Sequence, residues 1–304
     1  MEKFCVVANS WLKEKNLYVK NTTMSVYKHL LSKYLLPRFG NMTSISEDTV
    51  QQFVIQLLEQ GRKPNSVRSL LLVLKMIVRY GHRKGMFHDA EWSIRFPTAV
   101  HGVEAIPVMS LIHQRRLMKH LQQNLCCRNL GILISLCTGM RIGELCALRW
   151  QHVDTKNGTI RVERTLGRIY DCEEHKTYLV EGLPKTSSSR RLIPINKELQ
   201  EILAVFKRFA QEDYYVLTNK PSPTEPRTYR RYYNRLLDSL DIPRLKFHGL
   251  RHSFATRCIE KRCDYKTVSA ILGHASLSTT MDLYVHPDLA QKRQCIVRSA
   301  RLLE

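Results

Sequence analysis

Apolar residues in the first ninety positions of the chain recur at helical spacing. The clearest repeat runs from Asn65 to Lys84, and its apolar positions are Val67, Leu70, Leu71, Leu74, Ile77 and Val78. Residues three and four apart lie on one face of a helix and Gly85 follows the repeat, so the pattern predicts an amphipathic helix. The opposite face carries the basic residues Arg68, Lys75, Arg79, Arg83 and Lys84. This face is either exposed to solvent or in contact with the phosphates of a partner.

Three more helices are predicted before residue 61. Their ranges are Lys3–Asn16, Thr22–Leu36 and Ser46–Gln60. Pro37 ends the second helix because proline cannot continue a helical ladder. Ser44 or Ser46 can cap the third helix, and Gly61 stands just past its end. We therefore expect residues 1–95 to form a helical domain.

A stretch with few periodic features follows at residues 96–107. It reads Phe96-Pro-Thr-Ala-Val-His-Gly-Val-Glu-Ala-Ile-Pro, with two prolines bracketing a glycine, which is typical of an interdomain linker. Fully extended, it would span roughly 40 Å.

After the linker the periodicity becomes mixed. Helices are predicted from Ser110, at Arg128–Cys137, at Gly143–Arg149 and again from Lys197. The period changes to two at Thr159–Arg164 and Arg191–Ile195, with Lys176–Leu183 between them, which predicts a small antiparallel sheet. The expected fold is mainly α with a small antiparallel β-sheet. It comprises a helical N-terminal domain, an α+β domain at residues 108–286 and a C-terminal helix at residues 287–304.

The charge balance favours a polyanionic partner. The 304 residues include 48 Lys and Arg against 27 Asp and Glu, a net charge of +21. The excess is +8 in residues 1–100 and +13 in the rest, so both domains are basic. A merely basic protein or one bound to anionic membrane are the alternatives, but no basic amphipathic helix stands out. We expect DNA to be the partner, with contacts from both domains.

The cysteines and the apolar segments indicate a reducing compartment. Nine cysteines are present, an odd number, and no Cys-x-x-Cys occurs, so neither a disulfide framework nor a zinc ribbon is indicated. No run of about 18 apolar residues could cross a membrane, and the first residues do not resemble a signal peptide. We expect a cytoplasmic, nucleoid-associated protein without a membrane partner.

Four polar clusters beyond residue 137 carry candidate chemistry. They are Arg141 in Thr138-Gly-Met-Arg-Ile-Gly-Glu-Leu, His248 and Arg251 in His-Gly-Leu-Arg-His, His274 in Leu-Gly-His, and Tyr284 ten residues later. Arginines can clamp phosphate oxygens in a bidentate way, histidines can move protons near neutral pH, and a tyrosine can be a nucleophile. Each piece alone is more often a surface ion pair, a helix cap or a core residue. Their order and spacing together suit covalent attack on a phosphodiester.

At these residues the chain resembles the tyrosine recombinase, or phage integrase, family. The signature of that family is an Arg, a Lys on a β-hairpin, His-x-x-Arg, Leu-Gly-His and a Tyr. The matching stretches are Cys137-Thr-Gly-Met-Arg-Ile-Gly-Glu-Leu, Pro184-Lys-Thr-Ser-Ser-Ser-Arg-Arg-Leu-Ile-Pro-Ile, Phe247-His-Gly-Leu-Arg-His-Ser-Phe-Ala-Thr and Ile271-Leu-Gly-His-Ala-Ser-Leu-Ser-Thr-Thr-Met-Asp-Leu-Tyr-Val-His. They lie between Val108 and His286, and no catalytic position is missing.

The resemblance implies a site-specific DNA recombinase with a core-binding and a catalytic domain. Tyr284 would attack a scissile phosphate and form a 3′-phosphotyrosyl intermediate, which a 5′-hydroxyl from another strand attacks in reverse. The residues implied to stabilise the transition state are Arg141, Arg251, His248 and His274. Lys185 would protonate the leaving 5′ oxygen, with Lys176 as a rival. The chemistry needs no cofactor and no metal.

The resemblance also implies partners. These are double-stranded DNA with an inverted-repeat core site, a homo-tetramer on paired sites, and accessory DNA-bending or directionality proteins. Integration, excision or inversion of DNA and chromosome dimer resolution are all compatible with the sequence. The helix at residues 287–304 would dock either on its own domain or on a neighbouring protomer.

Three alternatives remain open at this point. A zinc site built from His248, His252, His274 and His286 is disfavoured, because Gly-Leu-Arg between the first two offers no Glu base and places an Arg beside the metal. A type IB topoisomerase shares much of the site. A DNA-binding protein without catalysis would require a lost catalytic residue. Separately, Tyr229, Tyr232 and Tyr233 lie in the basic run Arg227–Arg235, which we interpret as a DNA-facing helix.

Overall fold

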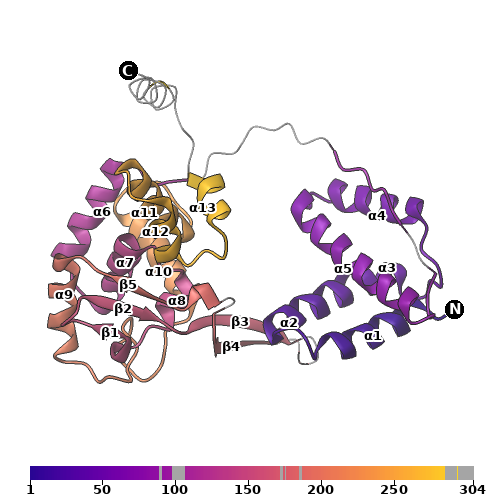
Figure 1. Ribbon diagram of the computed structural model, residues 1–304, viewed down its shortest axis with the longest axis horizontal. Coiled ribbons are helices and arrows are strands. Elements are labelled where there is room, and N and C mark those ends of the chain that lie inside the picture. The colour runs from indigo at the N-terminus through magenta and orange to yellow at the C-terminus, as the bar shows by residue number, and fades with distance from the viewer. Residues whose placement is uncertain are drawn as a thin grey trace, which may run out of the picture. The chain divides into compact units, whose positions relative to one another are not determined.

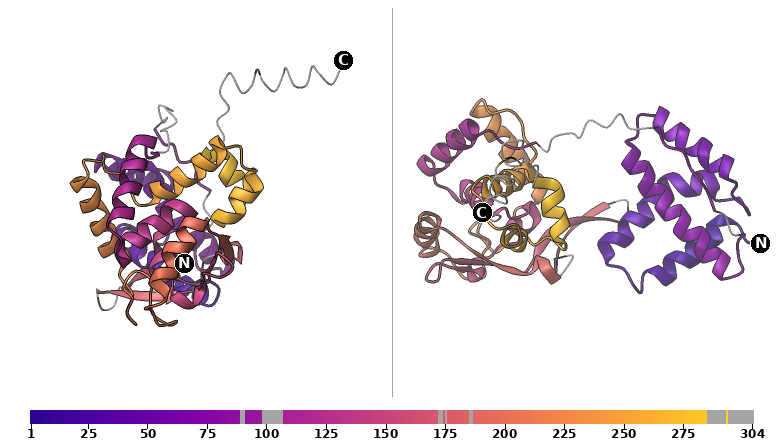
Figure 2. Two further views of the ribbon diagram at one scale, coloured as in Figure 1. Left: turned by 90° about the vertical axis from the view of Figure 1, so that its left-hand side faces the viewer. Right: turned by 45° about the horizontal axis from the view of Figure 1, so that its top comes forward.

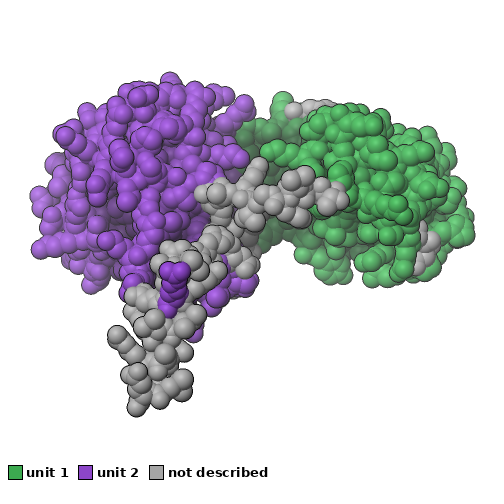
Figure 3. Space-filling view, turned by 90° about the horizontal axis from the view of Figure 1, so that it is seen from above, with its two compact units in different colours: residues 1–103, 168–179 green, residues 104–167, 180–304 purple. Residues whose placement is uncertain are grey.

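The computed structural model in Figure 1 describes residues 1–88, 91–97, 107–171, 174, 176–184, 187–284 and 293. The chain divides into two units, which are coloured green and purple in Figure 3. Unit 1 comprises residues 1–103 and 168–179, and unit 2 comprises residues 104–167 and 180–304. Each unit has a hydrophobic core of its own.

The described N-terminal segment of unit 1 is helical. Its elements are α1 (Phe4–Lys15), α2 (Asn21–Leu30), the π-helical turn η1 (Leu31–Leu35), α3 (Leu36–Phe39), α4 (Glu47–Glu59) and α5 (Pro64–Arg83). The four predicted helices are confirmed in type and approximate position. Ser46 caps α4 by accepting a hydrogen bond from the Thr49 amide at 3.3 Å. Gly61 and Gly85 follow α4 and α5 with φ of +77° and +65°.

The prediction that Pro37 ends the second helix is wrong. The backbone passes from α2 through η1 into α3. Pro37 lies in the first turn of α3, where a fixed φ and a missing N–H are tolerated. A proline therefore stands inside a continuous helical path, because the preceding turn changes from α to π geometry.

Helix α5 is the centre of the unit 1 core. Its predicted apolar face is buried, and it packs against buried aromatic side chains from α1, α3 and α4, namely Phe4, Trp11, Phe39 and Phe53. At Gly81 a Cβ atom would lie 2.7 Å from Val7 and 2.8 Å from Phe87. The missing side chain thus allows α5 to approach α1 closely.

Unit 2 contains eight α-helices among its described residues. They are α6 (Leu111–Gln123), α7 (Cys127–Thr138), α8 (Ile142–Cys146), α9 (Lys197–Lys207), α10 (Pro226–Ser239), α11 (His248–Glu260), α12 (Tyr265–Leu272) and α13 (Leu277–Tyr284). The apolar α7 is buried along most of its length, as predicted, and α11 packs against it. Helices α11, α12 and α13 lie side by side in both views of Figure 2.

The strands in the described ranges form two small sheets instead of the single one predicted. In the first, β2 (Thr159–Val162) pairs antiparallel with both β1 (Val153–Asp154) and β5 (Arg191–Pro194). Its register places Ile160 opposite Ile193, both buried. The second sheet pairs β3 (Thr165–Asp171) with β4 (Lys176–Gly182). The segment at 176–182 therefore forms a hairpin with β3, which is inserted in the sequence between β2 and β5 and does not join their sheet. The short 3₁₀ turns η2 (Trp150–His152) and η3 (Ser187–Ser189) flank these strands.

Helix α10 corrects the interpretation of its tyrosines. Tyr229 and Tyr233 are 1% and 0% exposed and pack their rings against Phe247. They belong to the core of unit 2 and cannot face DNA. Tyr232 is partly buried, while the arginines of the helix are exposed on the other face. Within the ranges that the structure describes, no helix is long and apolar enough to cross a membrane.

Candidate active site

Arg141 is fixed where α7 ends and α8 begins. Gly139 closes α7 in the left-handed region, with φ of +66°, and this turn makes Arg141 the N-cap of α8. Glu144 accepts hydrogen bonds from the Arg141 amide at 3.0 Å and from Arg141 Nη1 at 2.7 Å. Arg141 Nη2 donates to the Gly273 carbonyl at 3.1 Å. The guanidinium is therefore held from two sides.

The partner of Arg141 is a buried carboxylate. The Glu144 side chain is only 2% exposed, so its pair with Arg141 differs from a solvated surface ion pair. Arg191, on β5, donates from Nη1 to Oε1 at 3.2 Å and from Nη2 to Oε2 at 2.9 Å. Desolvation raises the pKa of Glu144, but hydrogen bonding and charge from Arg191, followed by Arg141, lower it overall. Glu144 is thus an anion shared by two arginines.

Arg251 lies in the first turns of α11 and is 1% exposed. Its Nη1 donates to the Gly139 carbonyl at 3.0 Å, whereas its Nη2 has no hydrogen-bond partner among the residues that the structure describes. Burial, and then the charge of Arg141, lower the pKa of Arg251 to about 9, which leaves it charged at neutral pH. An unpaired donor on a buried cation is costly. The arrangement therefore favours an anionic ligand at this position.

Tyr284 ends α13 beside the histidines of α11. Its hydroxyl lies 2.7 Å from Nδ1 of His252, and the His252 ring lies edge-to-face with His248 at 4.6 Å. Burial raises the pKa of the 7% exposed Tyr284, and the charges of Arg251 and Arg141 act in the opposite direction. The phenol thus lies within the field of both arginines.

The two α11 histidines are neutral at pH 7. Desolvation, and then the charge of Arg251, lower the pKa of His252. Desolvation followed by repulsion from His252, Arg251 and Arg141 also lowers the pKa of His248, although this residue keeps an exposed face. A neutral imidazole has one nitrogen able to accept a hydrogen bond.

His274 follows α12 in a tight turn. Gly273 has φ of +68°, and a Cβ atom there would lie 2.9 Å from the Ser188 carbonyl oxygen. His274 Nδ1 lies 2.7 Å from the Thr280 hydroxyl, and the imidazole stacks parallel to the Tyr284 ring at 6.4 Å. Burial and the neighbouring arginines lower the pKa of His274 to about 4. The turn thus brings a neutral imidazole to the nucleophile candidate.

Five of the six predicted site residues therefore gather in unit 2: Arg141, His248, Arg251, His274 and Tyr284. Lys185 lies outside the described residues, and its rival Lys176 is an exposed residue of β4. A pocket of about 360 Å³ opens beside Arg141 and His274, and Pro184, which precedes Lys185, is among its lining residues. Across the described ranges, no three His, Cys, Asp or Glu side chains are grouped to hold a metal.

The sequence motifs do not single out two residues of this site. His252 is a candidate only for the disfavoured zinc site, and Arg191 is predicted only as a strand residue. The alternation of that strand nevertheless places Arg191 on the same face as the buried Ile193. An arginine at an inward strand position requires a buried acceptor, and that signal would have identified it.

Comparison with known proteins places the chain in a family. A family model described as "Phage integrase family" matches residues 112–291, and one described as "Phage integrase, N-terminal SAM-like domain" matches residues 3–58. The chain therefore belongs to the phage integrase family of tyrosine recombinases. Its activity is site-specific DNA recombination by strand cleavage and transfer.

Relatives with similar sequences have the same class of activity. The chain is 26% identical to a tyrosine recombinase XerC-like protein of Caldanaerobacter subterraneus subsp. tengcongensis, over 81% of this chain and 68% of the relative. It is 25% identical to the ICEBs1 integrase of Bacillus subtilis, over 92% and 76% of the two chains. Tyrosine recombinase XerA of Pyrococcus furiosus is 26% identical, over 100% and 94%.

Solved structures show the same fold. A Tn1549 transposon integrase in complex with circular intermediate DNA has a TM-score of 0.80 at 20% identity, covering 98% of this chain and 99% of that one. A lambda integrase dimer bound to a core site has a TM-score of 0.64 at 18% identity, covering 93% and 78%. The prediction of a mainly helical fold with small antiparallel sheets is confirmed.

Proposed function

We propose that Tyr284 is the nucleophile of this recombinase and that Arg141 and Arg251 clamp the scissile phosphate. The phenolic oxygen attacks phosphorus, the bond from phosphorus to the 5′ oxygen breaks, and a 3′-phosphotyrosyl bond forms. His248 and His274 donate hydrogen bonds to the phosphate oxygens in the transition state, where negative charge is greatest. A 5′-hydroxyl reverses the reaction and restores the phosphodiester.

The observation that carries this proposal is the buried Nη2 of Arg251, which has no hydrogen-bond partner in the described part of the chain. It leaves one donor of a fixed guanidinium free beside Arg141. A phosphate oxygen is a strong acceptor for this planar donor group. Because both arginines also influence Tyr284, one anion bound to them would lie next to the phenol.

Proton transfers complete the proposed reaction. His252 is neutral and lies against the Tyr284 hydroxyl, so Nδ1 can accept the phenolic proton when the imidazole proton is on Nε2. Lys185, which follows Pro184 in the sequence and lies outside the described residues, is the proposed donor to the departing 5′ oxygen. These roles need neither a cofactor nor a metal.

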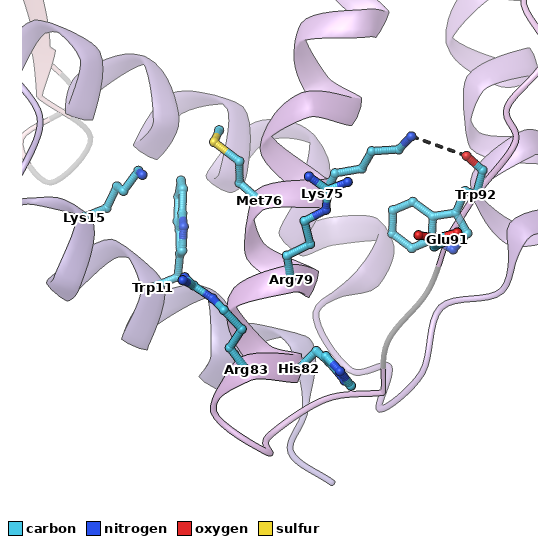
Figure 4. A pocket seen from close by; sticks show the side chains of 9 residues that line it. All are labelled: Trp11, Lys15, Lys75, Met76, Arg79, His82, Arg83, Glu91 and Trp92. Carbon is cyan, nitrogen blue, oxygen red and sulfur yellow. Dashed lines mark hydrogen bonds between the residues drawn. The ribbon is translucent and has the colours of Figure 1, made fainter.

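Unit 1 offers a basic groove for the DNA backbone. Figure 4 shows the groove, which has a volume of about 600 Å³ and is lined by Trp11, Lys15, Lys75, Met76, Arg79, His82, Arg83, Glu91 and Trp92. The basic side chains come from α1 and α5. Lys75 Nζ donates a hydrogen bond to the Trp92 carbonyl at 3.3 Å. We propose that the basic side chains of this groove bind phosphates along the DNA backbone. It supports residues 1–95 as a core-binding domain joined by residues 96–107 to a catalytic domain at 108–286.

The substrate we propose is double-stranded DNA with an inverted-repeat core site. Four protomers would assemble on two paired sites, with residues 287–304, which lie outside the described part of the chain apart from Arg293, docking on a neighbour. Integration, excision or inversion would follow from the placement of the sites and from accessory proteins. A nucleoid-associated protein in the cytoplasm is consistent with such a substrate.

Covalent trapping tests the nucleophile. Genomic DNA of the source organism is incubated with the protein, adducts that survive denaturation are isolated, and their DNA is sequenced to obtain the site. A nicked suicide duplex built on that site should form a gel-stable adduct with the native protein but not with Tyr284→Phe, which should still bind the duplex. Tyr233→Phe is the control because Tyr233 is a core tyrosine. An adduct formed by Tyr284→Phe would refute the assignment.

A further inference from the structure

Arg191 contacts three segments of unit 2, two of which lie next to the proposed catalytic residues Arg141 and His274. Its two terminal nitrogens contact both oxygens of Glu144 on α8. Its Nε donates to the Ile271 carbonyl near the end of α12, and Nη1 also donates to the Ser189 carbonyl at 3.0 Å. The side chain is only 6% exposed. Every nitrogen of this guanidinium is thus used inside the protein, which leaves little capacity for binding phosphate directly.

The packing around Arg191 extends to the turn before His274. A Cβ atom at Gly273 would lie 3.0 Å from Arg191 Cδ and 3.1 Å from Nη1. The Gly273 carbonyl in turn accepts a hydrogen bond from Arg141 Nη2. The guanidinium therefore packs against the same short turn that holds Arg141 from its second side.

We propose that Arg191 is a positioning residue for cleavage, which anchors the Glu144 carboxylate and so fixes the orientation of the Arg141 guanidinium against the scissile phosphate. This inference rests on the proposed function, in which Arg141 is half of the phosphate clamp. Arg191 itself contacts no substrate. Its effect reaches the reaction through Glu144 and the turn at Gly273.

The charges around Glu144 support this role. Arg141 and Arg191 contact the carboxylate, and the charge of Glu144 is also felt by His248 and Arg251. Desolvation raises the pKa of Glu144. The hydrogen bonds and charge of Arg191 lower this pKa more strongly than those of Arg141 do. Without Arg191, the pKa of the buried Glu144 carboxyl would be higher, so Glu144 would remain protonated to a higher pH. A protonated Glu144 has fewer acceptor sites for the Arg141 amide and guanidinium.

The test compares Arg191→Gln with Arg161→Gln on the suicide duplex. Arg161 lies on the neighbouring strand β2, and its side chain is 61% exposed, so its variant removes the same charge without affecting Glu144. Arg191→Gln should slow cleavage roughly 10²-fold, the scale of a small misplacement of a catalytic group, with unchanged affinity for the duplex. Arg161→Gln should cleave like the native protein. Native-like cleavage by Arg191→Gln would overturn the proposal.

A pH series separates positioning from a general loss of structure. Between about pH 5 and about pH 8 cleavage by Arg191→Gln, relative to the native protein, should rise with pH as Glu144 loses its proton. Arg191→Lys should abolish this rise by restoring a charge, and should recover part of the rate. A rate ratio that does not change with pH would contradict the proposal.

The double variant Glu144→Gln/Arg191→Gln covers the case in which Arg191→Gln alone fails to fold, because it leaves no unpaired buried carboxylate. It should fold, remain slow and show no added pH dependence. Native-like cleavage by the double variant, or persistence of the pH rise, would overturn the inference. Adduct formation by the native protein and its loss in Tyr284→Phe test the proposed function separately.

Discussion

The Tyr284 hydroxyl and His252 Nδ1 are 2.7 Å apart, although 32 residues separate them in the chain. The contact joins the end of α13 to the second turn of α11, the helix that also carries His248 and Arg251. At this distance the phenol can donate a hydrogen bond to Nδ1 when the imidazole proton is on Nε2. A lowered pKa of His252 leaves the imidazole neutral and able to accept a proton.

His252→Ala should therefore slow formation of the covalent adduct without weakening DNA binding. Removing a general base typically costs 10²- to 10⁴-fold in rate, or about 3 to 5 kcal/mol. Adduct formation on the suicide duplex would be timed at saturating protein. His120→Ala, on α6, is the control. An unchanged rate in His252→Ala would mean that the phenolic proton leaves by another route.

The pH dependence has a definite sign. Because the pKa of His252 lies below the usual value of 6.5, the imidazole is neutral at pH 7 and gains a proton only as the pH falls below that value. Protonation of His252 should then slow cleavage below about pH 6.5. From about pH 6.5 to about pH 8, the contribution of His252 to the cleavage rate should not change. A decline that begins above pH 7 would be inconsistent with His252 as acceptor.

Arg141→Lys and Arg251→Lys should reduce cleavage far more than binding. An ammonium group keeps the charge but cannot reproduce the planar, multidentate contacts of a guanidinium. We expect losses on the order of 10²-fold or more, comparable to removal of one preorganised donor. Arg244→Lys, which alters an exposed ion pair with Asp238, is the control. Near-normal cleavage by both site variants would show that these arginines are not the clamp.

The sequence predicted the parts of this protein that depend on local periodicity. Helix α5 was found because its apolar face repeats over twenty residues. The order of the polar motifs identified five residues that the fold brings together. The roles of Arg191 and His252 were not apparent, because both depend on tertiary contacts. Arg191 meets Glu144, 47 positions away, and His252 meets Tyr284 on another helix.

The wrong predictions also have physical causes. Tyr229 and Tyr233 are one helical turn apart and share a buried face, but the arginines between them suggested an exposed one. Pro37 was expected to end a helix, but a π-helical turn precedes it. The short alternation at 176–183 predicted a strand correctly, but it could not show which strand would be its neighbour.

Gly273→Ala should impair cleavage by disturbing the turn that holds Arg141 and His274. The substitution places a Cβ atom in the left-handed region, which costs on the order of 1 kcal/mol, and 2.9 Å from a backbone carbonyl oxygen. Gly85→Ala is the matched control, because Gly85 has nearly the same φ of +65°, and no atom of a described residue lies within 4 Å of the added Cβ. Cleavage rate and thermal unfolding should be affected more in Gly273→Ala. Equal effects would mean that only backbone strain matters.

The groove of unit 1 should contribute to the salt dependence of DNA binding. Arg79 and Arg83 are exposed on α5 and line this groove. Each phosphate that a variant no longer neutralises should lower the slope of log K against log salt by about 0.9. We therefore expect a smaller slope for Arg79→Ala and Arg83→Ala. The slope is obtained from the affinity of each variant for an intact duplex that carries the site identified by trapping, measured at several salt concentrations. Slopes equal to the native value would place the DNA on another face of unit 1.

Removal of the residues after His286 should impair pairing of sites more than binding to one site. Leu289, Ile296, Val297, Ala300 and Leu303 lie near one face if the tail is helical. A helix with such a face would need a partner, and docking on a neighbouring protomer would couple the position of each Tyr284 to assembly. The truncated protein should bind and cleave a single-site suicide duplex but exchange few strands between two duplexes. Formation of paired complexes would be followed by light scattering. If the truncated protein pairs sites and exchanges strands normally, the tail packs on its own domain or has no role in assembly.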